Sequence, residues 1–226
     1  DMKSAVKIVK EENKRVAELL GINPAARTTT VKPAGTTSLT LGTSSGIHAW
    51  HNDYYIRRVR VGKNESIYTH LLINHPEIIE DEYFRPHDTA VIGIPQKAPE
   101  GSITRQETAI QQLERMKKVY LEWIQGGHRR GDNTHNVSIT VSVRDSEWAQ
   151  VTEWMWKNKD SYAAISLLPL SNHTYHQAPF QDIGEADYNE RMDQLVNVDI
   201  DMIREDQDYT NLSGEAACVG GACVVT

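Results

Sequence analysis

With 226 residues, 39% of them hydrophobic, the chain is long enough to bury the core of one large domain or of two small ones. Its net charge of −7 excludes general attraction to nucleic acid or anionic lipid, so an anionic ligand must be held by local geometry. No apolar run reaches the roughly 18 residues of a membrane span, and the first ten residues lack the apolar centre of a signal peptide. We therefore expect a cytoplasmic protein without a membrane partner.

The first elements are predicted from apolar spacing and from β-branched residues. Residues 1–20 place their apolar side chains near one helical face, with Asp1 as the cap and Gly21 as the stop. The run 28–31 predicts a short strand that ends in a turn at Pro33.

Strand and helix signals alternate over the rest of the chain. Strands are predicted at 54–61, 89–94, 136–143 and 163–168, and helices at 65–74, at 106–125, from the cap Asp145 onward, and at 185–196. Strands separated by long helices imply crossover connections, so we expect an α/β fold with a mainly parallel sheet. From residue 199 the chain turns acidic and polar, which predicts a linker.

A candidate anion site follows the first predicted strand. Its residues are Ala34, Gly35, Thr36, Thr37 and Ser38. Consecutive backbone N–H groups and three hydroxyls would form a concave donor cluster suited to phosphate, and glycine would let the backbone approach closely. An ordinary glycine turn with a hydroxyl N-cap explains the same residues. A Walker loop is excluded, because the Gly-Lys-Ser/Thr ending is missing.

Other polar groups have competing explanations. The small-residue run 42–47 either lines the same site or forms a plain loop. The pairs His48 with His51 and His173 with His176 could bind a metal from one side, but neither has nearby carboxylates or cysteines, so hydrogen-bonded histidines are preferred. Three arginines of the strand 54–61 suit either an oxyanion or a solvated strand edge: Arg57, Arg58 and Arg60.

The only two cysteines, Cys218 and Cys223, stand near the end of the sequence. A disulfide between them would close a very short loop and contribute little to stability. Gly220 and Gly221 lie between them and allow the sulfurs to approach, so the pair is suited to thiol–disulfide exchange. Incidental cysteines, or part of a zinc site completed by distant histidines, are the alternatives.

Several motifs resemble the C-terminal half of the adenosylcobalamin-dependent (class II) ribonucleotide reductases. They are Thr-Thr-Thr-Val-Lys-Pro-Ala-Gly-Thr-Thr-Ser at 28–38, Leu-Gly-Thr-Ser-Ser-Gly-Ile-His at 41–48, Tyr-Tyr-Ile-Arg-Arg-Val-Arg at 54–60, and the terminal Cys-Val-Gly-Gly-Ala-Cys. The resemblance implies that residues 1–198 are the C-terminal portion of a ten-stranded α/β barrel. Residues 199–226 would then be a flexible acidic tail that carries the dithiol.

The resemblance also implies an activity and its partners. Ribonucleotides would become deoxyribonucleotides by radical chemistry, started when the cobalt–carbon bond of adenosylcobalamin breaks and a thiyl radical forms. Ala34, Gly35, Thr36, Thr37 and Ser38 would hold the substrate phosphates. The tail cysteines Cys218 and Cys223 would re-reduce the active-site disulfide and be reduced in turn by a thioredoxin-like protein. No metal ligand is implied in this chain.

The thiyl cysteine and the inner cysteine pair of such enzymes have no counterpart here, because there is no third cysteine. We therefore expect the chain to need an N-terminal half, fused or separate, and to be inactive alone. A non-catalytic nucleotide-phosphate binding module, a class I large-subunit fragment, and a metal-dependent protein using His173, His176 and the thiols are the alternatives.

Overall fold

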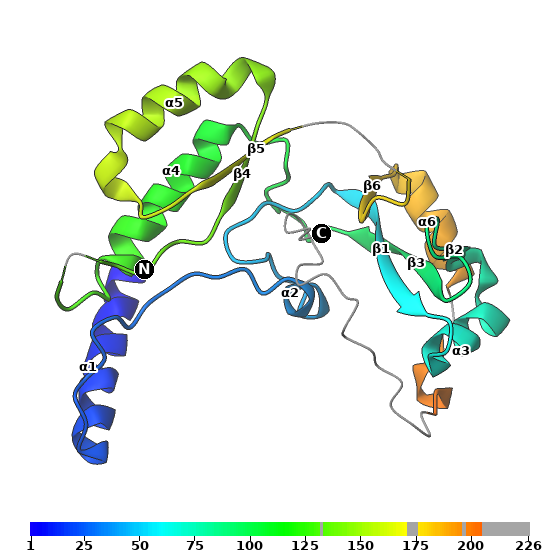
Figure 1. Cartoon of the computed structure of the whole chain (residues 1–226), viewed down its shortest axis with the longest axis horizontal. Coiled ribbons are helices and arrows are strands. Elements are labelled where there is room, and N and C mark those ends of the chain that lie inside the picture. The colour runs from blue at the N-terminus through cyan, green and yellow to red at the C-terminus, as the bar shows by residue number, and fades with distance from the viewer. Residues whose placement is uncertain (132, 171–175, 196–197, 205–226) are drawn as a thin grey trace. The chain divides into compact units, whose positions relative to one another are not determined.

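The computed structural model describes residues 1–131, 133–170, 176–195 and 198–204 (Figure 1). The chain divides into two compact units, each assembled from two stretches of sequence. Unit 1 comprises Asp1–Ala49 with Arg105–Ser171, and unit 2 comprises Trp50–Thr104 with Asn172–Thr226. The predicted boundary between residues 198 and 199 stays a prediction.

Unit 1 packs helices against a short pair of parallel strands. Strands β4 and β5 pair from Thr140↔Ser166 to Val143↔Pro169, and a single parallel bridge joins Val31 to Val137. The elements of the unit are α1 (Met2–Leu20), α2 (Thr36–Thr40), α4 (Ala109–Val119), β4 (Thr140–Val143), α5 (Trp148–Lys157) and β5 (Ser166–Pro169).

Local caps set the ends of the two longest helices. The Asp1 side chain accepts a hydrogen bond from the Lys3 amide, and Gly21 ends α1 in the left-handed conformation at φ 66°. Both ends of this predicted helix are confirmed. Thr108 and Gln111 form a capping box at the start of α4, three residues after the predicted start at Gln106. No helix within the described ranges has both the length and the apolar character needed to cross a membrane.

Helix α4 widens at its end into a π-helical turn over Tyr120–Ile124. There the Trp123 carbonyl accepts a hydrogen bond from the Thr29 hydroxyl at 2.6 Å, and the Trp123 indole donates to the Thr30 carbonyl at 3.1 Å. Gly127 follows, and a Cβ added to it would clash with the Thr29 hydroxyl and lie 2.7 Å from Thr29 Cγ2. The segment 28–31 is therefore held by the end of the helix.

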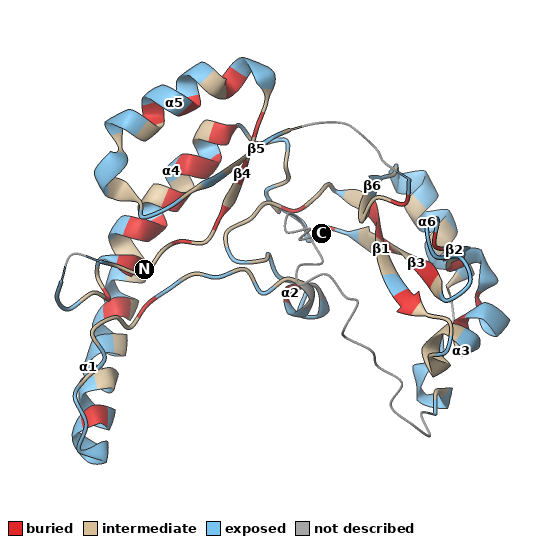
Figure 2. Cartoon of the chain, viewed as in Figure 1, coloured by how far each residue is buried: buried red, intermediate tan, exposed pale blue. Residues whose placement is uncertain are grey.

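The core of unit 1 lies between α4, α5 and the chain leading through β4 (Figure 2). Its fully buried side chains come from all three elements, and burial of each one contributes roughly 1.5–3 kcal/mol. They are Leu113, Met116, Ile124, Val137, Val141, Val143 and Val151.

Unit 2 is built on a four-stranded antiparallel sheet in the order β2-β3-β1-β6. Strands β1 and β3 pair along their whole length, from Tyr54↔Lys97 to Gly62↔Thr89. Helix α3 contributes Leu71 to the hydrophobic cluster on one end of this sheet. The elements are β1 (Tyr54–Gly62), α3 (Ser66–Asn74), β2 (Ile79–Asp81), β3 (Thr89–Lys97), β6 (Phe180–Asp182) and α6 (Glu185–Gln194).

The prediction of a mainly parallel sheet is wrong. Within the described residues, parallel pairing is confined to β4 with β5 and to the Val31–Val137 bridge, and the larger sheet is antiparallel. A residue pattern locates a strand but does not give its direction. The predicted strand 28–31 makes only that one bridge, because the Thr28 amide and the hydroxyls of Thr28 and Thr29 bond to carbonyls at the end of α4 instead. The predicted strands 136–143 and 163–168 are regular only from Thr140 and Ser166.

Candidate functional site

The turn that precedes α2 depends on the backbone of one glycine. Gly35 has a φ of 58°, in the left-handed region that glycine adopts without a steric penalty. An added Cβ would meet nothing within 4 Å. Backbone shape, and not a crowded neighbour, therefore requires glycine at this position.

Ser38 holds the turn together from the inside. Its side chain is buried, and its hydroxyl donates to the Gly35 carbonyl at 2.6 Å. Its own carbonyl accepts a hydrogen bond from the Thr43 amide at 2.9 Å. Ala34 and Thr37 are exposed, while the side chain of Thr36 is outside the described part of the structure. Of the predicted hydroxyl ligands whose side chains the structure describes, Thr37 is exposed and Ser38 is buried.

The second small-residue run packs against this turn. The Ser45 hydroxyl accepts a hydrogen bond from the Gly35 amide at 3.0 Å. A Cβ on Gly46 would lie 3.4 Å from the Pro33 backbone, and Gly46 has a φ of 61°. The structure thus brings together two runs that are separate in the sequence.

His48 ties this loop to the start of β4. Its Nε2 lies 2.9 Å from the Thr140 amide nitrogen and its Nδ1 lies 2.9 Å from the Ser45 carbonyl oxygen. Because an amide can only donate, Nε2 is the acceptor and the proton is on Nδ1, which donates to Ser45. A neutral His48 therefore links β4 through Ser45 to the Gly35 amide. The sequence did not reveal this role, since Thr140 is 92 residues away.

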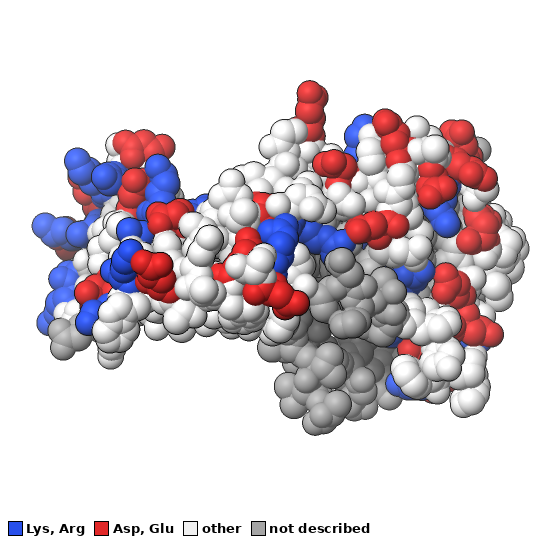
Figure 3. Space-filling view, turned by 90° about the horizontal axis from the view of Figure 1, so that it is seen from above, with Lys and Arg blue, Asp and Glu red and all other residues white. Residues whose placement is uncertain are grey.

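The end of the loop is also held by α4. Arg115 donates from Nε to the Ile47 carbonyl at 3.2 Å and forms two hydrogen bonds of 2.7 and 2.6 Å with the Glu107 carboxylate. This cation is therefore already paired. On the face shown in Figure 3, basic and acidic side chains are intermixed. An anion bound at the turn would be held chiefly by backbone donors.

His48 and His51, for which hydrogen bonding is preferred over metal binding, are not brought together as ligands. Both ring nitrogens of His48 are engaged within unit 1, whereas His51 belongs to unit 2 and pairs with Asp182 at 2.9 Å. His173 lies outside the described residues, as do Cys218 and Cys223. In the described part of the chain, no three His, Cys, Asp or Glu side chains are grouped so as to hold a metal ion.

The chain is similar to known enzymes of one kind. No family model matches the chain. The adenosylcobalamin-dependent ribonucleoside-triphosphate reductases of Lactobacillus acidophilus and Lactobacillus leichmannii are each 26% identical to it, over 98% and 99% of this chain. A probable enzyme of the same name from Dictyostelium discoideum is 29% identical over 85% of the chain. The resemblance to adenosylcobalamin-dependent ribonucleotide reductases is confirmed.

These reductases are much longer than this chain. The matched regions are 29%, 31% and 25% of the three relatives. A crystal structure of a B12-dependent (class II) ribonucleotide reductase shares the fold, with a TM-score of 0.71 and 23% identity over 86% of this chain and 27% of that one. The mixed α/β class is confirmed, while this portion of the fold does not establish a ten-stranded barrel.

Proposed function

We propose that this chain is the C-terminal portion of a reductase that converts ribonucleoside triphosphates to deoxyribonucleotides. The main support is the similarity to enzymes with this activity in their names, which covers nearly the whole chain. The same names favour adenosylcobalamin over the cofactor of a class I enzyme. Triphosphates are proposed as the substrates on the same ground.

In the complete enzyme, adenosylcobalamin would supply the radical that starts the reaction. We assign the radical-forming step to the remainder of the enzyme, because the thiyl cysteine and the inner cysteine pair have no counterpart among the two cysteines of this chain. The residues of this chain have two other proposed roles, which are binding of the substrate phosphates and delivery of reducing equivalents.

The first proposed role belongs to the turn of Ala34, Gly35, Thr36, Thr37 and Ser38. The N–H groups of the first turn of α2 have no acceptor within the helix, and such groups bind anions readily. The Gly35 amide is held by Ser45 and the Ser38 hydroxyl by Gly35. We therefore propose that the amides of Thr36 and Thr37 and the exposed Thr37 hydroxyl contact the phosphates, while Gly35 and Ser38 shape the turn.

The second proposed role belongs to Cys218 and Cys223, which we propose as the pair that re-reduces the active-site disulfide. A dithiol separated by two glycines and their flanking residues supports exchange chemistry, with one thiolate attacking and the other resolving the mixed disulfide. A thioredoxin-like protein would return the electrons to this pair.

The decisive experiment is reconstitution. The chain is combined with the N-terminal portion of the reductase, as a fused or separate polypeptide, and deoxyribonucleotide formation is measured with adenosylcobalamin and a ribonucleoside triphosphate. We expect activity only when both portions and the cofactor are present. If both portions are folded and associated but form no product, the reductase proposal fails, and phosphate binding without catalysis is the reading left.

A further inference from the structure

Arg57 carries a buried positive charge in unit 2. On β1 the side chains alternate between the two faces of the sheet, so Arg57 shares a face with Tyr55, Val59 and Val61. Val61 belongs to the hydrophobic cluster under α3. Arg57 is only 7% exposed, and this burial lowers the pKa of its guanidinium. Its surroundings therefore disfavour the charge that it carries.

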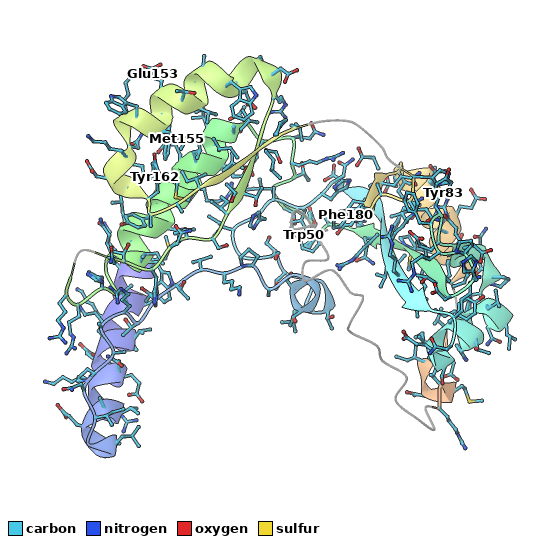
Figure 4. The ribbon with its side chains drawn as sticks, viewed as in Figure 1. Trp50, Tyr83, Glu153, Met155, Tyr162 and Phe180 are labelled. Atoms are coloured by element: carbon cyan, nitrogen blue, oxygen red, sulfur yellow. The ribbon has the colours of Figure 1, made fainter. Side chains whose placement is uncertain are left out.

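Arg57 lies between an aliphatic and an aromatic neighbour, because Ile94 stands opposite it on β3 and aromatic rings gather on the β6 side. Phe180, which is labelled in Figure 4, stands opposite Arg57 on β6. The Arg57 Cζ lies 5.9 Å from the centre of the Phe180 ring. Tyr55 and His51 pack on the same ring, with centroid separations of 5.8 and 4.9 Å. Asp182 is the acidic residue of β6, and its carboxylate lies 2.9 Å from the His51 ring. Across the described ranges, the Arg57 guanidinium has no hydrogen-bond or ion-pair partner.

The two other arginines of β1 differ in this respect. They project to the opposite face, where Arg60 pairs with the Glu82 carboxylate at 3.4 Å. Arg58 donates to the Gln181 side chain at 2.5 Å and lies 3.9 Å from Glu80. Burying an unpaired positive charge costs desolvation free energy. Attraction to an anion offsets this free energy only when the anion is well placed for hydrogen bonding. Arg58 Nε is itself buried without a hydrogen-bond partner, but the rest of its guanidinium is engaged by Gln181 and Glu80. Among the described residues, Arg57 is the arginine of this strand with neither a hydrogen bond nor an ion pair.

We propose that Arg57 receives a carboxylate side chain from the part of the reductase that lies outside these 226 residues. This inference rests on the proposed function, under which about 70% of the enzyme's length is contributed by other sequence, since the chain covers 25–31% of its relatives. The planar guanidinium fork binds a carboxylate through two parallel hydrogen bonds. Arginine among tyrosine and other aromatic rings is also the composition of the buried centre of a protein interface.

A carboxylate fits the geometry better than a phosphate does. Only 7% of Arg57 is exposed, so contact from outside the chain is limited to one small group. A phosphate would bring more charge, whereas Arg58 and Arg60 project to the other face and cannot share it. One cation in an aromatic setting matches one carboxylate.

The test compares Arg57→Met in two settings, this chain alone and the complete reductase. In the chain alone we expect the substitution to raise Tm, because it removes a buried unpaired charge and keeps most of the apolar volume. In the complete reductase we expect it to lower Tm by about 2–4 °C or more, because the partner carboxylate is then left without its cation. Arg57→Lys, which keeps the charge and loses the fork, should give a smaller loss in the complete enzyme.

Arg60→Met is the matched control. Its partner Glu82 lies within unit 2, so this substitution should lower Tm in both settings. A higher Tm for Arg57→Met in both settings would overturn the proposal, and so would a lower Tm in the chain alone, which would place the partner within this chain. Stabilisation of the wild-type reductase but not of Arg57→Met by inorganic pyrophosphate would assign the site to phosphate instead. An active reductase without the opposite Tm shifts refutes this inference alone, whereas an inactive reconstituted pair refutes the proposed function.

Discussion

Gly35 and Gly42 flank α2 and have nearly the same backbone conformation. Substituting each in turn therefore tests whether the conformation at Gly35 in particular is needed for phosphate binding. Gly35 has a φ of 58° and Gly42 a φ of 62°, and neither has a neighbour within 4 Å of an added Cβ. Gly35→Val would strain the left-handed conformation by about 1–2 kcal/mol, so the free turn would relax away from it. Binding that requires the original turn must restore this strain, which corresponds to roughly tenfold weaker substrate binding. We expect this loss in the complete reductase, measured as the dissociation constant for a ribonucleoside triphosphate. Gly42→Val imposes the same strain outside the turn, so an equal loss in both variants would contradict phosphate binding at Gly35.

His48 is a second residue whose effect on the turn can be measured separately from folding. His48→Ala removes the hydrogen bonds to both Thr140 and Ser45, whereas His48→Gln keeps an acceptor for the Thr140 amide. With about 0.5–1.5 kcal/mol for each of the two bonds, we expect KM for the triphosphate to rise by up to about 5- to 150-fold in the alanine variant. The kcat should change little, and glutamine should restore part of the affinity. Unchanged KM in the alanine variant would show that the turn does not depend on this link.

Among the elements, the connection between β2 and β3 depends on one buried carboxylate. Glu82 Oε2 accepts hydrogen bonds of 2.8 Å from the amides of Phe84 and Arg85, and Oε1 faces Arg60 at 3.4 Å. Burial by itself raises the pKa of Glu82, but these amides and Arg60 outweigh it and hold the pKa below the ordinary 4.5. The ionised form is therefore favoured by folding.

The resulting prediction concerns pH. A lowered folded-state pKa gives stability that is complete above the unfolded value and is lost as the pH falls through the folded one. We expect Glu82→Gln to lower the free energy of unfolding by about 1–3 kcal/mol at neutral pH, measured with urea. The difference from wild type should shrink as the pH falls below the ordinary 4.5. A difference independent of pH would mean that the charge of Glu82 is not the stabilising feature.

The elements also show what the sequence could predict and where it failed. The ends of α1 and the start of α4 follow from caps within three residues of the helix, so they were predictable at Asp1, Gly21 and nearly so at Thr108. The pairing of β1 with β3 and the capture of Thr29 by Trp123 join residues far apart in the chain. No local pattern encodes such contacts. The same holds for the turn, whose glycine was predictable while its attachment through His48 to β4 was not.

At the scale of the whole molecule, the proposed function makes this chain one portion of a longer reductase, with the tail dithiol as its connection to the rest. Cys218→Ser or Cys223→Ser in the complete reductase should leave the first turnover intact, because the active-site disulfide forms only during that turnover. Repeated turnover driven by thioredoxin should stop. Product formed in a single turnover measures the first effect, and the steady-state rate of product formation measures the second. Loss of the first turnover would refute the proposed role of the tail cysteines in re-reduction.

The close approach of Gly127 to Thr29 couples two positions that are 98 residues apart in the chain. The hydroxyl and methyl groups of Thr29 occupy the volume where a side chain at position 127 would begin. The space between the two backbones therefore accommodates a side chain at position 29 or at position 127, but not at both. A residue larger than glycine fits at position 127 only if Thr29 is replaced by a smaller residue. That replacement also removes the hydrogen bond from the Thr29 hydroxyl to the Trp123 carbonyl. Natural variation at either position is thus constrained by the identity of the other.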